Sequence, residues 1–394
     1  MISNISPNDS PMLSRRFGIG LAVFLALLLI VFLLNGVPGL SAESTGKSTV
    51  IPAEAQYKED FNGDGNINIV DVIALLLYQR ANPRDSKGDY NGDCTSNIAD
   101  AISLLLAQMA GKLTPVDDDV SPKAIHGTIV HDELYREYIL YVPTSYTGCD
   151  PVPLVFNFHG YTTLEHVERY MEGEVCDFRP VADSAGFIVV YPKGTPDSDS
   201  LFFWSFGDIT QPTDDLGFTE SLLDSIVSEY NIDLERVYAT GFSLGGFFSY
   251  YLACHLSDRF AAIASVKGTM WDLTFDECDP QQPTPILQIS GTNDYTVPYF
   301  GSNTVWGYME PIETVIQYWV NYNNCNPTPT TTALPDINPT DWKTVHRIAY
   351  SGGDNGVTVE FIVEVGGVHD WPTSLYTSVE IWNFFSKYDI NGLR

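Results

Sequence analysis

Ser243 is the residue most clearly suited to chemistry, because it stands between glycines in GFSLGG, residues 241–246. A strand-like run, RVYAT, precedes the motif, and a helix-like run, GGFFSYYLACHLSD, begins at its last two glycines. Glycines at such a turn permit the strained backbone that lifts a serine hydroxyl clear of a sheet. We predict that Ser243 is a nucleophile. The alternative is a tight glycine turn without chemistry.

A nucleophilic serine needs a base, and the base needs an acid that orients it. Asp294 in GTNDYTVPY follows the strand-like run PILQIS, and His369 in GGVHDWP follows the strand-like run VEFIVEV. The order serine, aspartate, histidine, each at the end of a strand, predicts a catalytic triad. Asp370 is the competing acid, but a sequence neighbour of the histidine rarely reaches its Nδ1 atom.

A third candidate segment, NFHGYTT at residues 157–163, ends an earlier strand-like run with His-Gly. A serine hydrolase stabilises its oxyanion with two backbone N–H groups, one after the nucleophile and one from such a loop. We expect these donors to be the N–H groups of Leu244 and Tyr161. We interpret His159 as a structural support for the loop rather than as a base.

Two acidic loops of twelve residues lie nearer the N-terminus: DFNGDGNINIVD at 60–71 and DYNGDCTSNIAD at 89–100. In a calcium loop, side chains at positions 1, 3, 5, 9 and 12 and the carbonyl at position 7 bind the ion. The alternative is a pair of Asx-turns that cap two helices, but repetition of the whole spacing favours two structural calcium ions. The predicted ligands are Asp60, Asn62, Asp64, Asn66, Asn68 and Asp71 in the first loop, and Asp89, Asn91, Asp93, Thr95, Asn97 and Asp100 in the second.

The second loop departs from the first at two positions. Cys94 stands where Gly65 permits the sharp turn, and Ser96 stands where Ile67 supplies an apolar side chain. A side chain at a position that needs a left-handed backbone is strained. We therefore expect the second loop to bind calcium less tightly than the first.

Residues 57–112 resemble a type I dockerin, the duplicated loop-helix module that binds cohesin domains of cellulosome-like scaffolds. The resemblance implies a small all-α module, two calcium ions and a cohesin-bearing scaffold protein as partner. Loop positions 10 and 11, a Ser-Thr pair in clostridial dockerins, are Ile69 and Val70, then Ile98 and Ala99. Ile69 and Ile98 would either suit an apolar interface or pack beneath their own helices.

From about residue 125, short apolar runs such as PLVFNFHG and GFIVVYP alternate with amphipathic runs such as GFTESLLDSIVSEY. Strands that alternate with helices predict an α/β domain with a mostly parallel sheet covered on both faces. We assign this domain to residues 125–394, and we assign linkers to residues 43–56 and 113–124, which are Ser/Thr-rich or combine prolines with acids.

The motifs around Ser243, Asp294 and His369 resemble the secreted esterase family that groups polyhydroxybutyrate depolymerases with feruloyl esterases. The resemblance spans about residues 125–390. It implies an α/β-hydrolase fold, a doubly wound and mostly parallel sheet, with those three residues as the triad and no catalytic cofactor. It leaves the acyl group undecided.

An uncharged apolar run at residues 17–34 follows Arg15 and Arg16 and indicates an export signal. Residues 1–42 are either cleaved after Ala42 or retained as an N-terminal membrane anchor, and both alternatives place the rest of the chain outside the cell. Some of the six cysteines should then form disulfides, whose connectivity the sequence leaves open. The net charge of −30 argues against nucleic acid as a partner.

These patterns together predict a secreted serine carboxylic-ester hydrolase delivered to a scaffold by a calcium-loaded dockerin. Feruloyl or acetyl esters on xylan are the first substrate class and a polyhydroxyalkanoate is the second. Two alternatives remain: a catalytically silent, calcium-dependent adhesion or assembly protein, and a serine peptidase on the same fold.

Overall fold

The computed structural model describes residues 61, 66–67, 69–81, 94, 98–110, 123–207, 213–335 and 337–394. The predicted leader and linkers lie mostly outside these residues. No helix in the described part of the chain is long and apolar enough to span a membrane. The following predicted calcium ligands also lie outside: Asp60, Asn62, Asp64, Asn68, Asp89, Asn91, Asp93, Thr95 and Asn97.

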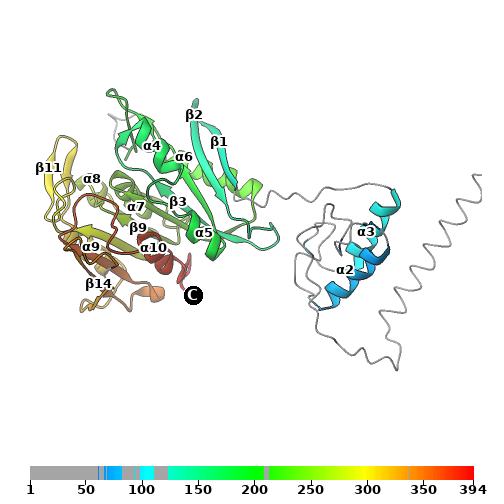
Figure 1. The fold of residues 1–394 in the computed structure, drawn as a ribbon. Coiled ribbons are helices and arrows are strands. Elements are labelled where there is room, and N and C mark those ends of the chain that lie inside the picture. The colour runs from blue at the N-terminus through cyan, green and yellow to red at the C-terminus, as the bar shows by residue number, and fades with distance from the viewer. Residues whose placement is uncertain are drawn as a thin grey trace, which may run out of the picture.

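Two helices, α2 (Ile69–Ala81) and α3 (Ile98–Ala110), pack side by side in what we call the helical region, residues 61–110 (Figure 1). Their contacts are reciprocal. The Gln79 side chain of α2 donates a hydrogen bond to Asp100 at the start of α3 (3.2 Å), and Gln108 of α3 donates to Asp71 at the start of α2 (3.5 Å). A small apolar core lies between the helices: Phe61, Val72, Leu75, Tyr78, Ala101 and Leu104.

Ten strands form one sheet in what we call the α/β region, residues 123–394. Its six central strands are parallel, which confirms the expected mostly parallel sheet, and two antiparallel strands extend it at each edge. In spatial order the strands are β1 (Lys123–His131), β2 (Leu134–Val142), β5 (Ile188–Pro192), β3 (Val152–Phe158), β8 (Ile232–Phe242), β9 (Ala262–Val266), β10 (Ile286–Gly291), β15 (Val359–Val365), β14 (Thr344–Tyr350) and β13 (Thr330–Ala333).

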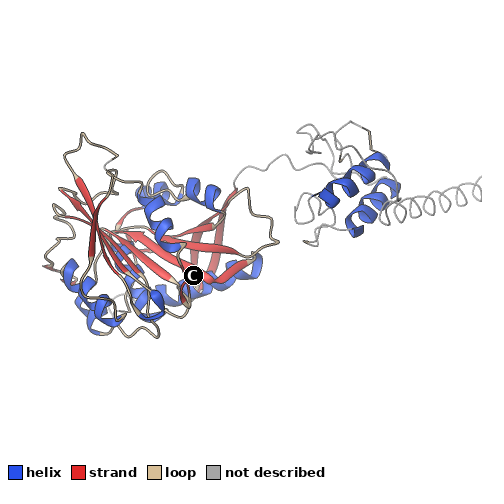
Figure 2. Ribbon diagram, turned by 90° about the horizontal axis from the view of Figure 1, so that it is seen from below, coloured by secondary structure: helices blue, strands red, loops and turns tan. Residues whose placement is uncertain are grey.

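Helices cover both faces of this sheet, as Figure 1 and Figure 2 show. Side chains alternate along β3, so Leu154 and Phe156 pack in one core and Val155 packs in the other. Because both faces are buried, the central strands read as nearly continuous apolar runs. One core includes α6 (Asp215–Glu229), α7 (Leu244–His255) and α9 (Ile312–Tyr322), and the other includes α4 (Leu164–Met171), α5 (Arg179–Ala185) and α10 (Thr377–Phe385).

Shorter elements decorate the sheet, and several of them border the candidate site. They are β4 (Thr162–Thr163), β6 (Thr195–Pro196), β7 (Leu201–Phe203), α8 (Asp272–Asp276), β11 (Ser302–Thr304), β12 (Gly307–Met309), the 3-10 turn η2 (Asp354–Gly356), β16 (Tyr388–Asp389) and β17 (Gly392–Leu393).

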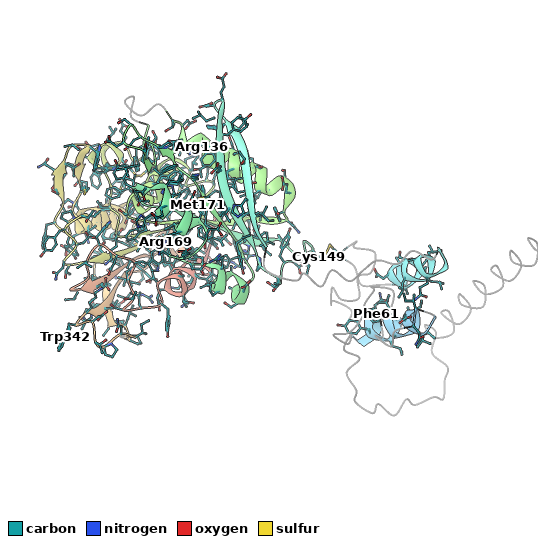
Figure 3. All side chains as sticks on the ribbon, turned by 45° about the horizontal axis from the view of Figure 1, so that its top comes forward. Phe61, Arg136, Cys149, Arg169, Met171 and Trp342 are labelled. Atoms are coloured by element: carbon teal, nitrogen blue, oxygen red, sulfur yellow. A yellow bond between two sulfur atoms is a disulfide. The ribbon has the colours of Figure 1, made fainter. Side chains whose placement is uncertain are left out.

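Two disulfides confirm that some of the cysteines pair. Cys254 pairs with Cys278 inside the α/β region, and Cys94 of the helical region pairs with Cys149, which Figure 3 places at the edge of the α/β region. Cys94 has the left-handed backbone that its loop position requires, with φ of 63°. Its bond to Cys149 therefore joins the second predicted calcium loop covalently to the α/β region.

Candidate active site

Ser243 lies at the sharp turn between β8 and α7, with φ of 54° and ψ of −119°. The flanking glycines are required because the chain is crowded here. A Cβ atom on Gly245 would lie 2.0 Å from the carbonyl oxygen of Phe158, and one on Gly241 would lie 2.5 Å from the backbone of Gly245. The GFSLGG motif thus lets β8 and α7 pack against β3 while the serine projects from the turn.

The structure brings together the three residues predicted as a triad. The His369 Nε2 atom lies 2.9 Å from Ser243 Oγ, and its Nδ1 atom lies 2.7 Å from an oxygen of Asp294. The other Asp294 oxygen accepts hydrogen bonds from the N–H groups of Thr296 and Val297, which fix the carboxylate. This chain of hydrogen bonds can move a proton from the serine hydroxyl to the imidazole.

Asp370, the competing acid, faces a different partner. Its carboxylate lies 3.5 Å from Lys343 Nζ, in an ion pair at the edge of the site. The carboxylate bonded to the His369 ring is that of Asp294, which is only 4% exposed. The geometry therefore favours Asp294 as the orienting acid.

The predicted oxyanion donors lie on either side of the serine. Leu244 is the first residue of α7, and Tyr161 follows Gly160, where a Cβ atom would lie 3.2 Å from the Cβ of Ser243. Tyr161 is held by a hydrogen bond from its hydroxyl to Asp197 (2.6 Å). Tyr161, on its loop, and Leu244, at the start of α7, thus both lie beside Ser243, and the role of their N–H groups stays a prediction.

His159 is fully buried and both of its ring nitrogens have partners. Its Nε2 atom accepts the N–H of Gly194 (2.9 Å), so Nδ1 carries the proton and donates to the carbonyl of Gly160 (2.7 Å). Burial lowers the pKa of His159 to about 4; the hydrogen bond to the Gly160 carbonyl opposes this shift, and Lys193 and Arg136 add smaller contributions that lower the pKa. The ring is neutral at physiological pH and supports the Tyr161 loop, in agreement with the structural interpretation.

A cavity of about 620 Å³ opens at Ser243 and His369. Part of its wall comes from α8 and from the β11–β12 hairpin, whose Trp306 packs edge-to-face on Tyr161 with ring centroids 5.5 Å apart. The sequence gives no signal for this wall, because the hairpin has strands of three residues and no apolar periodicity. Many of the lining residues are aromatic, among them Tyr161, Phe206, Phe242, Phe247, Trp271 and Trp306.

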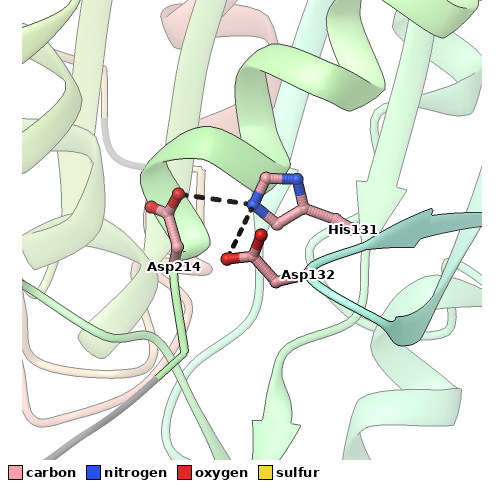
Figure 4. Close-up of side chains that lie close together, drawn as sticks. All are labelled: His131, Asp132 and Asp214. Atoms are coloured by element: carbon pink, nitrogen blue, oxygen red, sulfur yellow. Dashed lines mark hydrogen bonds and ion pairs between the residues drawn. The ribbon is translucent and has the colours of Figure 1, made fainter.

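Among the described residues, one further group has metal-ligating side chains close together: His131, Asp132 and Asp214 (Figure 4). The His131 ring contacts Ser221 Oγ (3.1 Å) and Asp214 (3.3 Å), so both nitrogens have partners. Asp214 also caps α6 by accepting the N–H of Gly217. These contacts explain the cluster as a helix cap.

Of the predicted calcium ligands, the structure describes Asn66, Asp71 and Asp100.

Comparison with known proteins places the similarity in the α/β region. A family model described as Esterase PHB depolymerase matches residues 136–278, which include Ser243 but end before Asp294 and His369. The bifunctional acetylxylan esterase/xylanase XynS20E of Neocallimastix patriciarum is 28% identical over 260 residues, 65% of this chain and 34% of that protein. Feruloyl esterase B of Piromyces equi is 30% identical over 203 residues, 49% of this chain and 37% of that protein.

The chain thus spans little more than a third of the length of these two curated relatives. A probable feruloyl esterase C of Aspergillus niger is 26% identical over 240 residues, 58% of this chain and 79% of that protein. Among solved structures, an acetyl xylan esterase from Aspergillus awamori aligns with a TM-score of 0.49 at 14% identity, covering 66% of this chain and 99% of that one. The matching family model and relatives are named as esterases, and the order of Ser243, Asp294 and His369 after three strands of a doubly wound sheet is the order typical of α/β-hydrolases.

The two candidate acids can be separated by substitution. Asp294→Asn should lower kcat by roughly 10³- to 10⁴-fold, because an amide would hold the imidazole in the wrong tautomer. Asp370→Asn should lower kcat less than about tenfold, since the Asp370 carboxylate pairs with Lys343. Steady-state ester hydrolysis by both variants measures the difference, and the reverse ranking would assign the acid to Asp370.

Burial of His159 predicts a pH-dependent stability. Its pKa is about 4 in the folded protein and 6.5 in the unfolded chain, so the unfolded state binds more protons between these values. The contribution of the neutral His159 ring to the free energy of unfolding is fully present above pH 6.5. It is lost as the pH falls toward 4, and the loss amounts to roughly 3 kcal/mol. His159→Gln keeps a donor and an acceptor but does not titrate. Denaturant unfolding across this range should show a weaker pH dependence for the variant, and equal curves would refute this explanation.

Proposed function

We propose that the protein is a secreted serine carboxylic-ester hydrolase that a calcium-loaded dockerin attaches to a cohesin-bearing scaffold. The observation that carries the catalytic part is the hydrogen-bonded chain from Asp294 through His369 to Ser243, at the wall of an aromatic cavity. The dockerin part is supported by the repeated loops and by the reciprocal packing of α2 and α3.

In the proposed reaction, Ser243 Oγ attacks the ester carbonyl carbon while His369 Nε2 takes the hydroxyl proton. The carbonyl electron pair moves onto oxygen, where the N–H groups of Tyr161 and Leu244 stabilise it. When the carbonyl re-forms, the alkoxide leaves and takes the proton from His369. Water then attacks the acyl-enzyme by the same route, and a carboxylic acid and free Ser243 result.

Feruloyl or acetyl esters on xylan remain the first substrate class. The relatives named above are called feruloyl or acetylxylan esterases. The matching family model is instead named for PHB depolymerase, which corresponds to the second substrate class. A cavity of about 620 Å³ exceeds what an acetyl group fills, and its aromatic lining suits a planar phenolic acyl group. We therefore rank the feruloyl ester above the acetyl ester.

An extracellular location fits the chemistry of the cysteines. The structure has two disulfides, and disulfides persist in oxidising compartments. The apolar run at residues 17–34 would direct export, as a cleaved signal or as a membrane anchor.

One substrate panel separates the candidate activities. Methyl ferulate, acetylated xylan and hydroxybutyrate oligomers should be compared with the amide of ferulic acid. We expect the highest kcat/KM on methyl ferulate and negligible amide hydrolysis. A preference for the amide would indicate a peptidase, and inactivity on all four would favour a catalytically silent assembly protein.

Removal of the nucleophile tests the covalent mechanism. Ser243→Ala should lower kcat by roughly 10⁶-fold without unfolding the protein, and His369→Ala should lower kcat comparably because triad members act as a unit. Ester hydrolysis and circular dichroism of both variants provide the measurement. Turnover by Ser243→Ala within a few-fold of the wild type would exclude the serine mechanism.

Calcium should stabilise the helical region alone. Each loop places three carboxylates within twelve residues that include no Lys or Arg, so ion binding should contribute directly to folding of residues 57–112. We expect chelation to abolish a separate low-temperature transition in calorimetry of the full chain, to release cohesin, and to leave ester hydrolysis largely unchanged.

Loop variants provide the control for the calcium prediction. Asp60→Ala should weaken the tighter site and Asp89→Ala the weaker one, because Gly65 accepts the loop bend more readily than Cys94. Calcium titration of both variants measures this order. Absence of calcium binding, or loss of catalysis in step with unfolding of the helical region, would contradict the proposed division of labour.

A further inference from the structure

A buried ion pair lies beneath the loops that carry the candidate triad. Lys267 Nζ lies 2.6 Å from a carboxylate oxygen of Glu364, and both side chains are 0% exposed. Lys267 directly follows β9, and Glu364 is the penultimate residue of β15. A buried pair contributes little net stability compared with apolar residues of similar size. Its position therefore needs an explanation beyond stability.

The Glu364 carboxylate contacts both ends of the His369 loop. On the N-terminal side, a Cβ atom on Gly367 would lie 2.1 Å from Oε2 of Glu364, so the carboxylate lies directly against the loop backbone. On the C-terminal side, the Ser374 hydroxyl donates to Oε1 at 2.8 Å. Lys343 adds a second cation at 3.2 Å. One carboxylate thus fixes the segment from Gly367 to Ser374, in the middle of which His369 lies.

Lys267 contacts the other side of the site. A Cβ atom on Gly291, at the end of β10, would lie 2.6 Å from its Nζ atom, so the ammonium lies against the start of the Asp294 loop. That loop is bonded to the histidine loop, because Asn293 donates its N–H to the carbonyl of Gly367 at 2.9 Å. The ion pair therefore contacts the loops of both the acid and the base.

The nucleophile is connected to the same position along the backbone. The Ser243 N–H donates to the carbonyl of Val266 at 2.8 Å, and Val266 immediately precedes Lys267. Lys267 itself has a left-handed backbone, with φ of 54°, which a non-glycine residue adopts only where its surroundings enforce it. The strained residue and its salt bridge thus lie where the serine, aspartate and histidine segments converge.

We infer that the Lys267–Glu364 ion pair positions His369 between Asp294 and Ser243, an inference that rests on the proposed esterase function. Lys267 and Glu364 are positioning residues, because they act through the loops and reach no reacting atom. Loss of either charge would leave the other buried without its closest partner and would let the histidine loop shift.

The test compares two buried glutamates of the same strand. Glu364→Gln removes the charge at the site end of β15, and Glu360→Gln removes the matched charge of a residue that is 5% exposed and pairs with Arg347 and Lys387. Ester hydrolysis by the full chain is measured well below each variant's Tm. We expect Glu364→Gln and Lys267→Met to lower kcat by roughly 10- to 100-fold with little change in KM, the scale of loss for a small misplacement, and Glu360→Gln to keep wild-type kcat.

A spectroscopic readout separates positioning from mere destabilisation. The His369 Nδ1 proton, bonded to Asp294, should give a downfield proton NMR resonance in the wild type and in Glu360→Gln. The resonance should be lost or shifted in Glu364→Gln and Lys267→Met. Wild-type kcat and an unchanged resonance in folded Glu364→Gln, or equal losses of kcat in Glu360→Gln, would overturn the inference.

The test stays decisive if one variant fails to fold or if the proposed function is wrong. If Glu364→Gln does not fold, Lys267→Met removes the other charge of the pair, and an unchanged kcat and an unchanged resonance in that variant would equally overturn the inference. The resonance does not depend on turnover. Failure of the proposed function, seen as full activity of Ser243→Ala, is therefore distinguishable from failure of the positioning role.

Discussion

The close approach of β3, β8 and α7 is the constraint on which the candidate site depends. Only glycine at 241 and 245 lets these backbones meet, and the turn between them leaves Ser243 with a left-handed backbone. The cost of this strain is offset by cores buried on both faces of the sheet. Because the central strands are parallel, their carboxyl ends lie at one edge of the sheet. The loops that carry Asp294 and His369 begin at this edge and therefore reach Ser243.

The catalytic candidates were predictable because each has a local signal: glycines around Ser243, and a strand followed by a loop before Asp294 and His369. The mostly parallel sheet was predictable for the same reason, since its strands are buried on both faces and read as apolar runs. The sequence already favours Asp294 over Asp370, because a neighbour of the histidine rarely reaches its Nδ1 atom, and the structure adds that Asp370 pairs with Lys343.

Other features had no readable signal in the sequence. The pairing of Cys94 with Cys149 depends on how the two regions meet in space, and Cys176 and Cys325 stay buried as thiols. The aromatic wall from the β11–β12 hairpin and the Lys267–Glu364 pair join residues far apart in the chain. From the sequence, a lysine directly after an apolar strand indicates only that the strand ends there. Its burial against Glu364 is visible only in the structure. Most predicted calcium ligands lie outside the described residues and stay predictions.

The central claim is that Ser243 forms a covalent intermediate in the aromatic cavity. Intact-mass and peptide mass spectrometry after treatment with a p-nitrophenyl phosphonate tests it most directly, because this reagent captures a serine that an adjacent histidine activates. We predict stoichiometric labelling confined to the peptide that contains Ser243, and none in Ser243→Ala. Labelling of a different residue, or full ester hydrolysis by a chain that takes up no label, would contradict the account.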